Sequence, residues 1–136
     1  LYRLGLITQV KLCCRKLTAN MVDGIYIRIV NSGRRPITLH RITFICKGGK
    51  AHKFKISNSI GARASSPFDN PDLSHPCLNE SQLFEFMLDS TNFDFSSFEI
   101  ESVIKVLIES STGSSIEVKG LAADIKKNAH HLIKST

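Results

Sequence analysis

The stretch that decides the fold is GIYIRIVNSG, residues 24–33. Isoleucine stands at positions 25, 27 and 29, and each alternates with another side chain, so the three isoleucines share one face of an extended chain. Asn31-Ser32-Gly33 follows and predicts a turn, because asparagine and glycine tolerate positive φ. The stretch therefore predicts a half-buried β-strand that ends in a tight bend.

The same period of two recurs along the chain, with turn residues between the repeats. It predicts about seven strands, at 4–14, 24–31, 36–46, 51–57, 82–89, 100–109 and 114–120. After residue 120 the period becomes helical, because Leu121, Ile125 and Leu132 fall on one stripe, and this predicts an amphipathic helix over 121–134. Strands with this spacing are typical of an all-β sandwich of two sheets, here a single domain of residues 1–136.

The third strand changes parity along its length. Its apolar side chains stand at odd positions up to Leu39 and at even positions from Ile42 onwards. One extra residue near His40-Arg41 would return both sets to the same face, which is the effect of a β-bulge. We therefore expect a bulge at this point.

Two glycines after the third strand predict a hairpin. A three-residue loop of Gly48, Gly49 and Lys50 would place Phe44 opposite Phe54, with apolar groups on matching faces. In that register His52 would lie opposite Cys46, which raises the idea of a Cys–His nucleophile. Since both side chains would point inward, a core contact is the favoured interpretation.

A second hairpin is predicted over residues 100–120. A loop of Ser111, Thr112 and Gly113 matches a type I turn followed by a left-handed residue, and it pairs Ile108 with Ile116. Ile104 is expected on the same inward face as Ile108. Before this hairpin, three phenylalanines between residues 93 and 98 add aromatic bulk to the core.

Residues 57–79 show no strong period and contain three prolines. The segment is either a crossover between the sheets or a functional loop, because unstructured connections of this length are uncommon. His75 and Cys77 stand in it, near Asp69 and Asp72, so a hydrolytic or zinc cluster is conceivable. The prolines favour a rigid, irregular connection instead.

The rest of the chain shows no catalytic signature. There is no Walker loop, no H-E-x-x-H and no G-x-S-x-G. His130 and His131 are adjacent, and neighbouring helical positions diverge by about 100°, which favours a solvated pair over a metal site. We therefore predict that the chain is not an enzyme, with no catalytic residues, no metal ligands and no cofactor.

The composition is that of an ordinary globular protein: 42% apolar and 22% charged residues exclude global disorder. No apolar stretch is long enough to span a bilayer. The four cysteines, at 13, 14, 46 and 77, lack C-x-x-C spacing, so we expect reduced and mostly buried thiols. This cysteine usage favours a cytoplasmic location.

Charge is distributed unevenly along the chain. Residues 1–68 hold 13 basic side chains and one acidic, whereas residues 69–136 hold 5 basic and 11 acidic. Such asymmetry suits a surface for nucleic acid or anionic lipid, although basic and acidic strands can also pair across a sheet. If the first three strands are neighbours, the predicted polyanion-binding stripe consists of Arg3, Lys11, Arg15, Lys16, Arg28, Arg34, Arg35 and Arg41.

Two runs, IRIVNSGRRPITL at 27–39 and VLIESSTG at 106–113, resemble a pattern in small bacterial β-sandwich proteins of uncharacterised function. The resemblance implies an immunoglobulin-like sandwich, in many such proteins behind an N-terminal membrane anchor. It is carried by strands and turns, and it brings no catalytic residues to this sequence.

These features predict a non-enzymatic binding or assembly module with an unidentified protein partner, which binds through exposed edge strands or the 57–79 loop. Edge strands could also join copies of the chain into a homo-oligomer. The alternative is that the basic N-terminal half docks on an anionic membrane surface or on nucleic acid. A tether to the inner membrane, supplied by a segment upstream of residue 1, is compatible with the expected cytoplasmic location.

Overall fold

A computed structural model describes residues 6–17, 20–61, 73–90 and 92–132, and for 6–17, 20–23 and 130–131 it describes the backbone alone. Within these ranges the strands are β1 (Leu6–Leu17), β2 (Asn20–Asn31), β3 (Ile37–Cys46), β4 (Ala51–Lys55), β5 (Cys77–Leu78), β6 (Leu83–Leu88), β7 (Val103–Ser110) and β8 (Ser115–Glu117). The α-helices are α1 (Leu121–Lys127) and α2 (Ala129–Leu132), and the 3₁₀ turns are η1 (Asn58–Ile60), η2 (Phe95–Ser97) and η3 (Ile100–Ser102).

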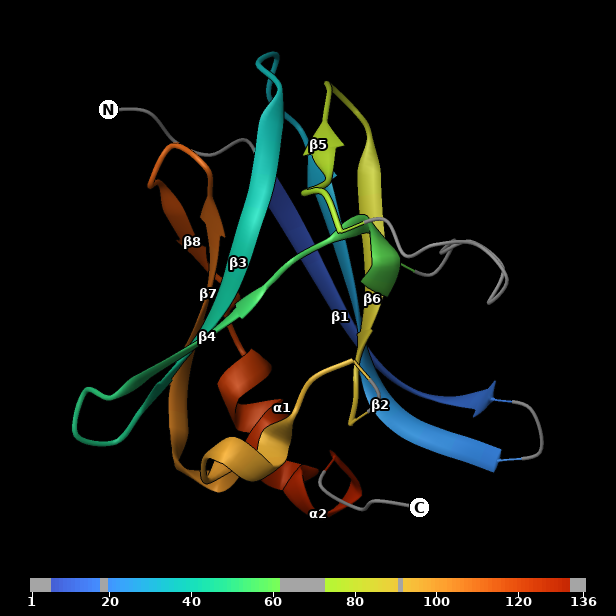
Figure 1. The fold of residues 1–136 in the computed structure, drawn as a ribbon, viewed down its shortest axis with the longest axis vertical. Helices are drawn as coiled ribbons and strands as arrows, with labels where there is room; N and C mark the ends of the chain where they lie inside the picture. Colours follow the sequence, from blue (N-terminus) through green and yellow to red (C-terminus); the bar gives the residue numbers. More distant parts are fainter. Residues whose placement is uncertain (1–5, 18–19, 62–72, 91, 133–136) are drawn as a thin grey trace.

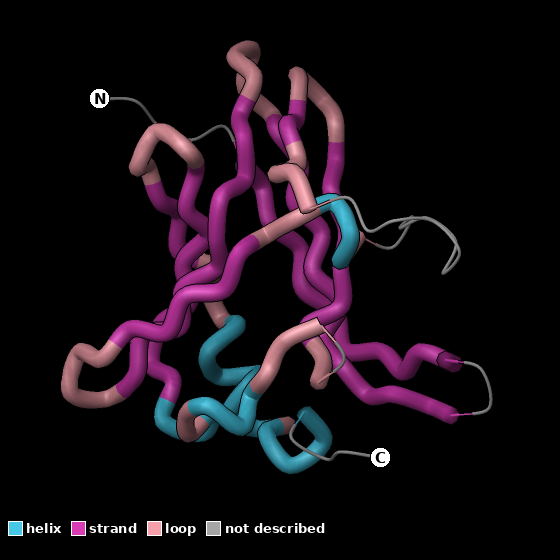
Figure 2. Tube along the Cα trace, in the orientation of Figure 1, coloured by secondary structure: helices cyan, strands magenta, loops and turns pink. Residues whose placement is uncertain are grey.

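The strands form two antiparallel sheets, which Figure 1 shows as two layers with the helices at one end. One sheet has the order β1-β2-β6 and the other the order β4-β3-β7-β8, with the short β5 also paired to β3. Figure 2 shows the same division into strands and helices along the trace. The prediction of a mostly β protein with two sheets and a helical C-terminus is confirmed. The described residues contain eight strands rather than seven, because β5 forms inside the segment that showed no period.

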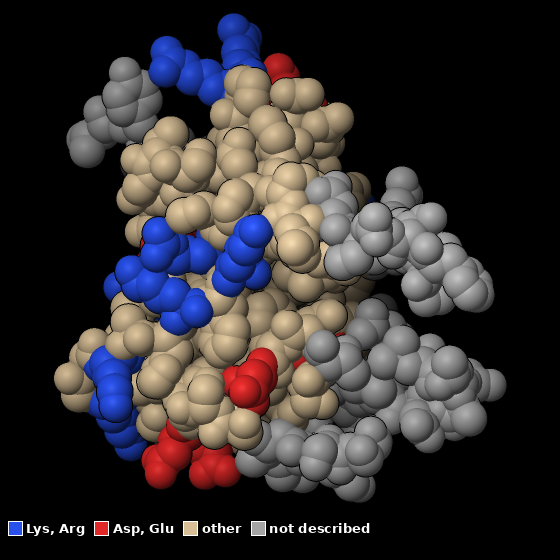
Figure 3. Space-filling view, viewed as in Figure 1, with Lys and Arg blue, Asp and Glu red and all other residues tan. Residues whose placement is uncertain are grey.

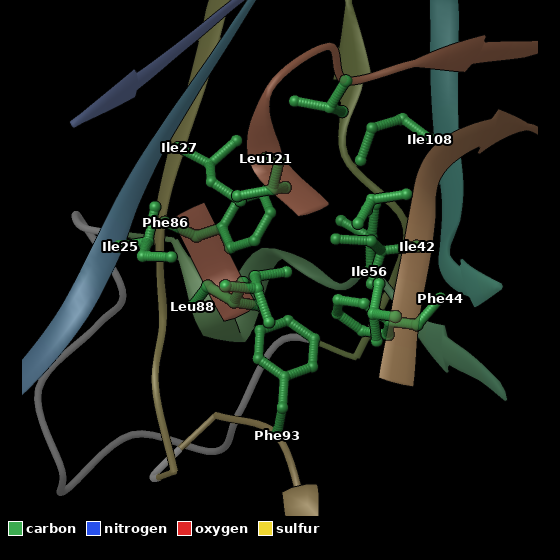
Figure 4. Packing of buried hydrophobic residues seen from close by; sticks show 14 of the residues in the cluster. Ile25, Ile27, Ile42, Phe44, Ile56, Phe86, Leu88, Phe93, Ile108 and Leu121 are labelled. Carbon is green, nitrogen blue, oxygen red and sulfur yellow. The ribbon is translucent and has the colours of Figure 1, made fainter. Parts of the chain in front are cut away.

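The core lies between the two sheets. Ile25, Ile27 and Ile29 of β2 are fully buried, as the opening stretch of sequence predicts. Figure 4 shows Ile25 and Ile27 facing the inward side chains of the other sheet, among them Phe44 and Ile108, which both have no exposed surface. Burial of these side chains is the main stabilising term, about 1.5–3 kcal/mol for each large apolar group.

The predicted bulge in β3 is confirmed. The pairing of β3 with β7 shifts by one residue between Leu39 and Arg41, and Leu39 and Ile42 on either side of the shift are both fully buried. His40 and Arg41 lie at the bulge and are half-buried. The extra residue thus keeps two apolar sets on one face.

The predicted register of the β3–β4 hairpin is wrong. Phe44 lies opposite His52, and the loop consists of Lys47, Gly48 and Gly49, closed by a hydrogen bond from the Cys46 N–H to the Lys50 carbonyl (2.8 Å). The two glycines have φ of 89° and 85°, a region that glycine adopts at no steric cost. Cys46 and His52 are therefore not opposite each other, and the His52 ring instead stacks on Phe98 at 4.4 Å between ring centroids.

The register of the β7–β8 hairpin is as predicted. Ile108 pairs with Ile116, and Gly113, the last of the three loop residues, has a φ of 88°. The expected inward position of Ile104 is wrong: its side chain is 56% exposed, while Val103 is buried. A second register shift, between Ile45 and Cys46, reverses the parity of β7 at this point.

The C-terminal helix forms with its predicted buried stripe, which Leu121, Ile125 and Leu132 share. It divides into α1 and α2 at Asn128, whose side-chain amide donates a hydrogen bond to the Asp124 carbonyl (2.9 Å). No helix in the described residues is long and apolar enough to cross a membrane.

Candidate functional site

A hollow opens at one place along the edge of β3, on the outer face of the five-stranded sheet. β4 pairs with Arg41–Ile45 of β3, and β5 pairs with Ile37 and Thr38 further along the same edge. Between these two partners lies the bulge. The hollow has a volume of about 380 Å³, and its lining, which we call the basic pocket, consists of His40, Arg41, Lys53, Phe54, Lys55 and His75.

The bulge explains why β3 supplies two adjacent basic residues. In a regular strand, His40 and Arg41 would point to opposite faces. At a bulge both side chains can lean to one side, and such irregularities often re-aim side chains beside binding sites. Both residues line the basic pocket. The same irregularity that completes the core on one face therefore builds the pocket on the other.

β4 adds two lysines by ordinary alternation. Lys55 lies opposite Arg41 and Lys53 lies opposite Thr43, so both lysines fall on the outer face, where they are exposed. Figure 3 shows Lys and Arg side chains gathered over β3 and β4 on this face. Among the described residues, no carboxylate forms an ion pair with either lysine.

In the part of the chain that the structure describes, one carboxylate lies beside the pocket, and it is already engaged. Glu109 of β7 pairs with Arg41 (Nε to Oε2, 3.3 Å), and its other oxygen accepts a hydrogen bond from the Thr43 hydroxyl (2.7 Å). The negative charge of Glu109 thus neutralises Arg41, whereas the positive charges of Lys53 and Lys55 are not neutralised by it. The basic pocket has an excess of positive charge.

Two histidines complete the pocket. The ring of His75 meets that of His40 edge-on, with centroids 4.5 Å apart. His75 lies next to the end of β4, and its Nδ1–H donates to the Ile56 carbonyl (2.8 Å), since a carbonyl only accepts. This bond fixes the ring and leaves Nε2 of His75 unprotonated in the neutral form.

His40 is held in its neutral form. Its Nδ1 accepts a hydrogen bond from the Arg41 Nε–H (3.3 Å), which requires Nδ1 to carry no proton. Partial burial lowers the pKa of His40 below its ordinary 6.5, and the nearby His75 and Arg41 lower it further; Lys55 acts in the same direction and Glu109 opposes them. The positive neighbours that disfavour a proton on His40 would, by the same electrostatic effect, favour an anion bound in the basic pocket.

The structure places the described members of the predicted polyanion stripe on separate parts of the fold. β3 leaves the sheet of β1 and β2, so Arg41 lies in the other sheet from Arg28. Arg34 and Arg35 are exposed in the bend that connects the two sheets. That bend is fixed by Asn31, whose buried side-chain amide donates to the carbonyls of Arg35 and Leu78 (2.8 Å each).

The remaining members of the stripe are only partly described. Lys11, Arg15 and Lys16 lie on β1, where the backbone alone is described, and Arg3 lies outside the described residues. Arg28 is half-buried on β2, and its buried Nε has no hydrogen-bond partner in the described part of the chain. Of the four members whose side chains are described, Arg28, Arg34, Arg35 and Arg41, only Arg41 lines the basic pocket.

The other sequence candidates form no site among the residues whose side chains are described. Cys46 is buried and Cys77 is exposed, and both are free; the side chains of Cys13 and Cys14 lie outside the described residues, so the expectation of mostly buried thiols stays a prediction. Asp69 and Asp72 lie outside the described residues, as do the side chains of His130 and His131. Across the described residues, no group of three His, Cys, Asp or Glu side chains is placed to hold a metal ion.

Comparisons with known proteins leave the family open. No protein-family model matches the chain, and no curated protein matches it. A solved structure with some likeness is the X-ray structure of Northeast Structural Genomics Consortium target SoR45, with 11% sequence identity over 83% of this chain and 80% of that chain and a TM-score of 0.27. A likeness at this level carries no argument about fold or function.

Proposed function

We propose that the chain is a non-enzymatic binding domain, an immunoglobulin-like sandwich whose basic pocket receives an acidic side chain of a protein partner. One observation carries the proposal: five basic side chains surround a hollow of about 380 Å³, and Glu109, the one carboxylate beside it within the described ranges, is already engaged. A carboxylate entering the hollow would supply the missing negative charge. Hydrogen bonds between charged groups of this kind are roughly twice as strong as neutral ones.

The shape of the site favours a protein partner over nucleic acid or a membrane. Its basic groups converge on one small hollow, whereas a duplex or a lipid surface is served by a broad stripe of charge. Arg28, Arg34 and Arg41, which would have formed such a stripe, lie on separate parts of the fold. Within the described lining, Phe54 is the one aromatic side chain apart from the histidines, which offers little for stacked bases.

The lining also favours binding over catalysis. Among the described residues, the lining contains no serine, threonine, cysteine or carboxylate to act as a nucleophile. Each of the two histidines uses its Nδ1 in a hydrogen bond within the fold. These bonds position the rings, as expected for a preformed binding site.

The test is a titration with a blocked pentaglutamate peptide, followed by NMR shifts of the backbone amides at low salt. Lys53→Glu reverses a charge in the pocket and is expected to weaken binding by about tenfold or more, since like charges then face each other. Lys105→Glu is the matched control: Lys105 lies on β7 and pairs with Glu117 (3.6 Å), and we expect its replacement to change the affinity by less than about threefold.

Two further ligands decide the nature of the partner. Anionic liposomes and a DNA duplex are titrated under the same conditions, at several salt concentrations. Tighter binding of either one than of the peptide, lost in Lys53→Glu, would overturn the protein partner. Equal effects of the two substitutions on peptide binding would overturn the pocket itself.

A further inference from the structure

We infer that the partner segment is an extended chain that adds to β4 as an antiparallel strand, with acidic residues at alternate positions. It would bind the edge of β4 that pairs with no other strand in the described ranges. The inference rests on the proposed function, because it assumes that an acidic protein segment enters the basic pocket. It goes further in naming the backbone edge that binds the segment and the sequence pattern that the segment carries.

The backbone of β4 has hydrogen-bonding groups to offer. The flanking bonds of the β3–β4 ladder run from the Ile56 N–H to the His40 carbonyl (3.0 Å) and from the Cys46 N–H to the Lys50 carbonyl (2.8 Å). In an antiparallel ladder, hydrogen-bonded pairs alternate with non-bonded pairs. The even-numbered residues of β4 therefore bond to β3, and Ala51, Lys53 and Lys55 turn their N–H and carbonyl groups away from it.

β4 is also the end strand of its sheet, in the order β4-β3-β7-β8. The strand at the opposite end, β8, has three residues, and its Glu117 is paired with Lys105. β4 has five residues, and its outer-face lysines pair with no carboxylate in the described ranges. Of these two edges, β4 is the one equipped to bind an acidic segment.

The side chains of β4 set the pattern of the segment. Residues directly opposite on paired strands have their Cβ atoms about 4.5–5.5 Å apart. Acidic residues opposite Lys53 and Lys55 would thus lie against the two lysines, on the outer face. The residue between them would point to the inner side next to Phe54, which is half-buried, so an apolar side chain fits there. The expected motif is acidic, apolar, acidic.

The same lysines disfavour a second copy of this edge. If two β4 strands paired antiparallel about Lys53, that residue would face its own copy and Ala51 would face Lys55. Like charges directly opposite are destabilising, and lysines on edge strands are a common guard against self-association. The edge is therefore selective: it opposes its own copy and favours an acidic strand.

The experiment uses the blocked pentapeptide Glu-Val-Glu-Val-Glu and two N-methylated forms of it. In the antiparallel arrangement the glutamates lie opposite Lys53 and Lys55 and exchange hydrogen bonds with them, whereas the valine N–H groups point away. Methylation of the glutamate nitrogens should weaken binding by about tenfold or more, and methylation of the valine nitrogens by less than about threefold. Unmodified peptide should also slow hydrogen exchange of the Lys53 and Lys55 amides.

The outcomes separate this inference from the proposed function. Equal binding of the three peptides, or unchanged exchange at Lys53 and Lys55, would overturn strand addition while the charged contact stands. Loss of binding through valine methylation alone would overturn the antiparallel arrangement. If neither this peptide nor pentaglutamate bound, the proposed function itself would fail.

Discussion

The two hairpins of the five-stranded sheet are built alike and carry opposite charge arrangements on their outer faces. In β7–β8, Lys105 lies 3.6 Å from Glu117, so a basic side chain is neutralised by its cross-strand neighbour. In β3–β4, the outward lysines of β4 lie opposite Arg41 and Thr43 instead. Lys105 of the first hairpin is paired within the fold, whereas Lys53 and Lys55 of the second pair with no described carboxylate and remain available to a partner.

This difference shows that the net positive charge of the first half of the chain is not all available for binding. The excess of basic residues in the first half of the chain is partly absorbed by acidic residues of the second half, as the pair of Arg41 with Glu109 shows. Binding depends on the basic side chains that no acidic residue of the fold neutralises. That remainder is concentrated at the bulge and on β4, where a hollow is also present.

The largest expected effect contrasts the inner faces of the two hairpins. Phe44 of β3 is fully buried and contacts Phe54, Phe95 and Phe98 at centroid distances of 5.6–6.2 Å. Phe44→Ala should lower the free energy of unfolding by about 3–5 kcal/mol. Ile116→Ala, at a half-buried position of β8, should lower it by about 1–2 kcal/mol.

Urea unfolding followed by circular dichroism measures both values. A loss for Ile116→Ala as large as that for Phe44→Ala would show that β8 is as integral to the core as β3. That result would contradict the burial on which the contrast between the hairpins rests.

The second prediction removes in turn the two carboxylates of the β7–β8 hairpin, Glu109, which pairs with Arg41 of the other hairpin, and Glu117, which pairs within its own. Glu109→Gln breaks a partly buried ion pair and should cost about 1 kcal/mol of stability. It also adds one positive charge to the basic pocket, so the Glu-Val-Glu-Val-Glu peptide should bind several-fold more tightly. Glu117→Gln breaks an exposed pair, so we expect a loss of less than about 0.5 kcal/mol and unchanged peptide affinity.

Unfolding curves and peptide titrations of both variants give the comparison. Weaker peptide binding in Glu109→Gln would mean that Glu109 holds Arg41 in its binding position, and the charge argument would be wrong. An equal gain in affinity for Glu117→Gln would show that the peptide is attracted by the net charge of the whole outer face of the sheet rather than by the basic pocket.

Much of the fold follows from local sequence rules. The alternation in β2, the bulge in β3 and the β7–β8 register each depend on side-chain period and on one turn glycine. The same rule that places glycine last in a three-residue loop would have given the β3–β4 register, since Gly49 rather than Lys50 then takes the left-handed position. Pairing Phe44 with Phe54 gave a different register. Side-chain alternation could not exclude it, because shifting β4 by two residues along β3 leaves every side chain on the same face of the sheet.

The site was harder to predict because it depends on long-range placement. The sequence identifies the bulge at His40-Arg41, but it does not show that β3 leaves the first sheet or that His75 returns to the end of β4. The sequence does predict that Lys53 and Lys55 share one face, since they alternate with Phe54 on a predicted strand. Local period cannot tell whether such lysines are neutralised, because the partner strand comes from a distant part of the chain.

The smallest expected effect concerns pH and again contrasts the two hairpins, since the β7–β8 hairpin contains no histidine. In the folded chain the pKa of His40 lies below 6.5, mainly because of partial burial and then because of His75 and Arg41. Below pH 6.5 the unfolded chain therefore takes up a proton at His40 that the folded chain does not. Stability should fall as the pH is lowered from 7 towards the folded pKa, because the unfolded state binds more protons.

His40→Gln tests this sign directly, because glutamine can still accept a hydrogen bond from Arg41 and does not titrate. The difference in unfolding free energy between the wild type and His40→Gln should change in favour of the variant as the pH falls below 6.5. Peptide affinity should show the opposite trend in the wild type: a bound carboxylate favours the protonated ring, so binding tightens on acidification and loses part of that response in His40→Gln. Parallel pH profiles for the two proteins, in stability and in affinity, would show that His40 does not sense the charge in the basic pocket.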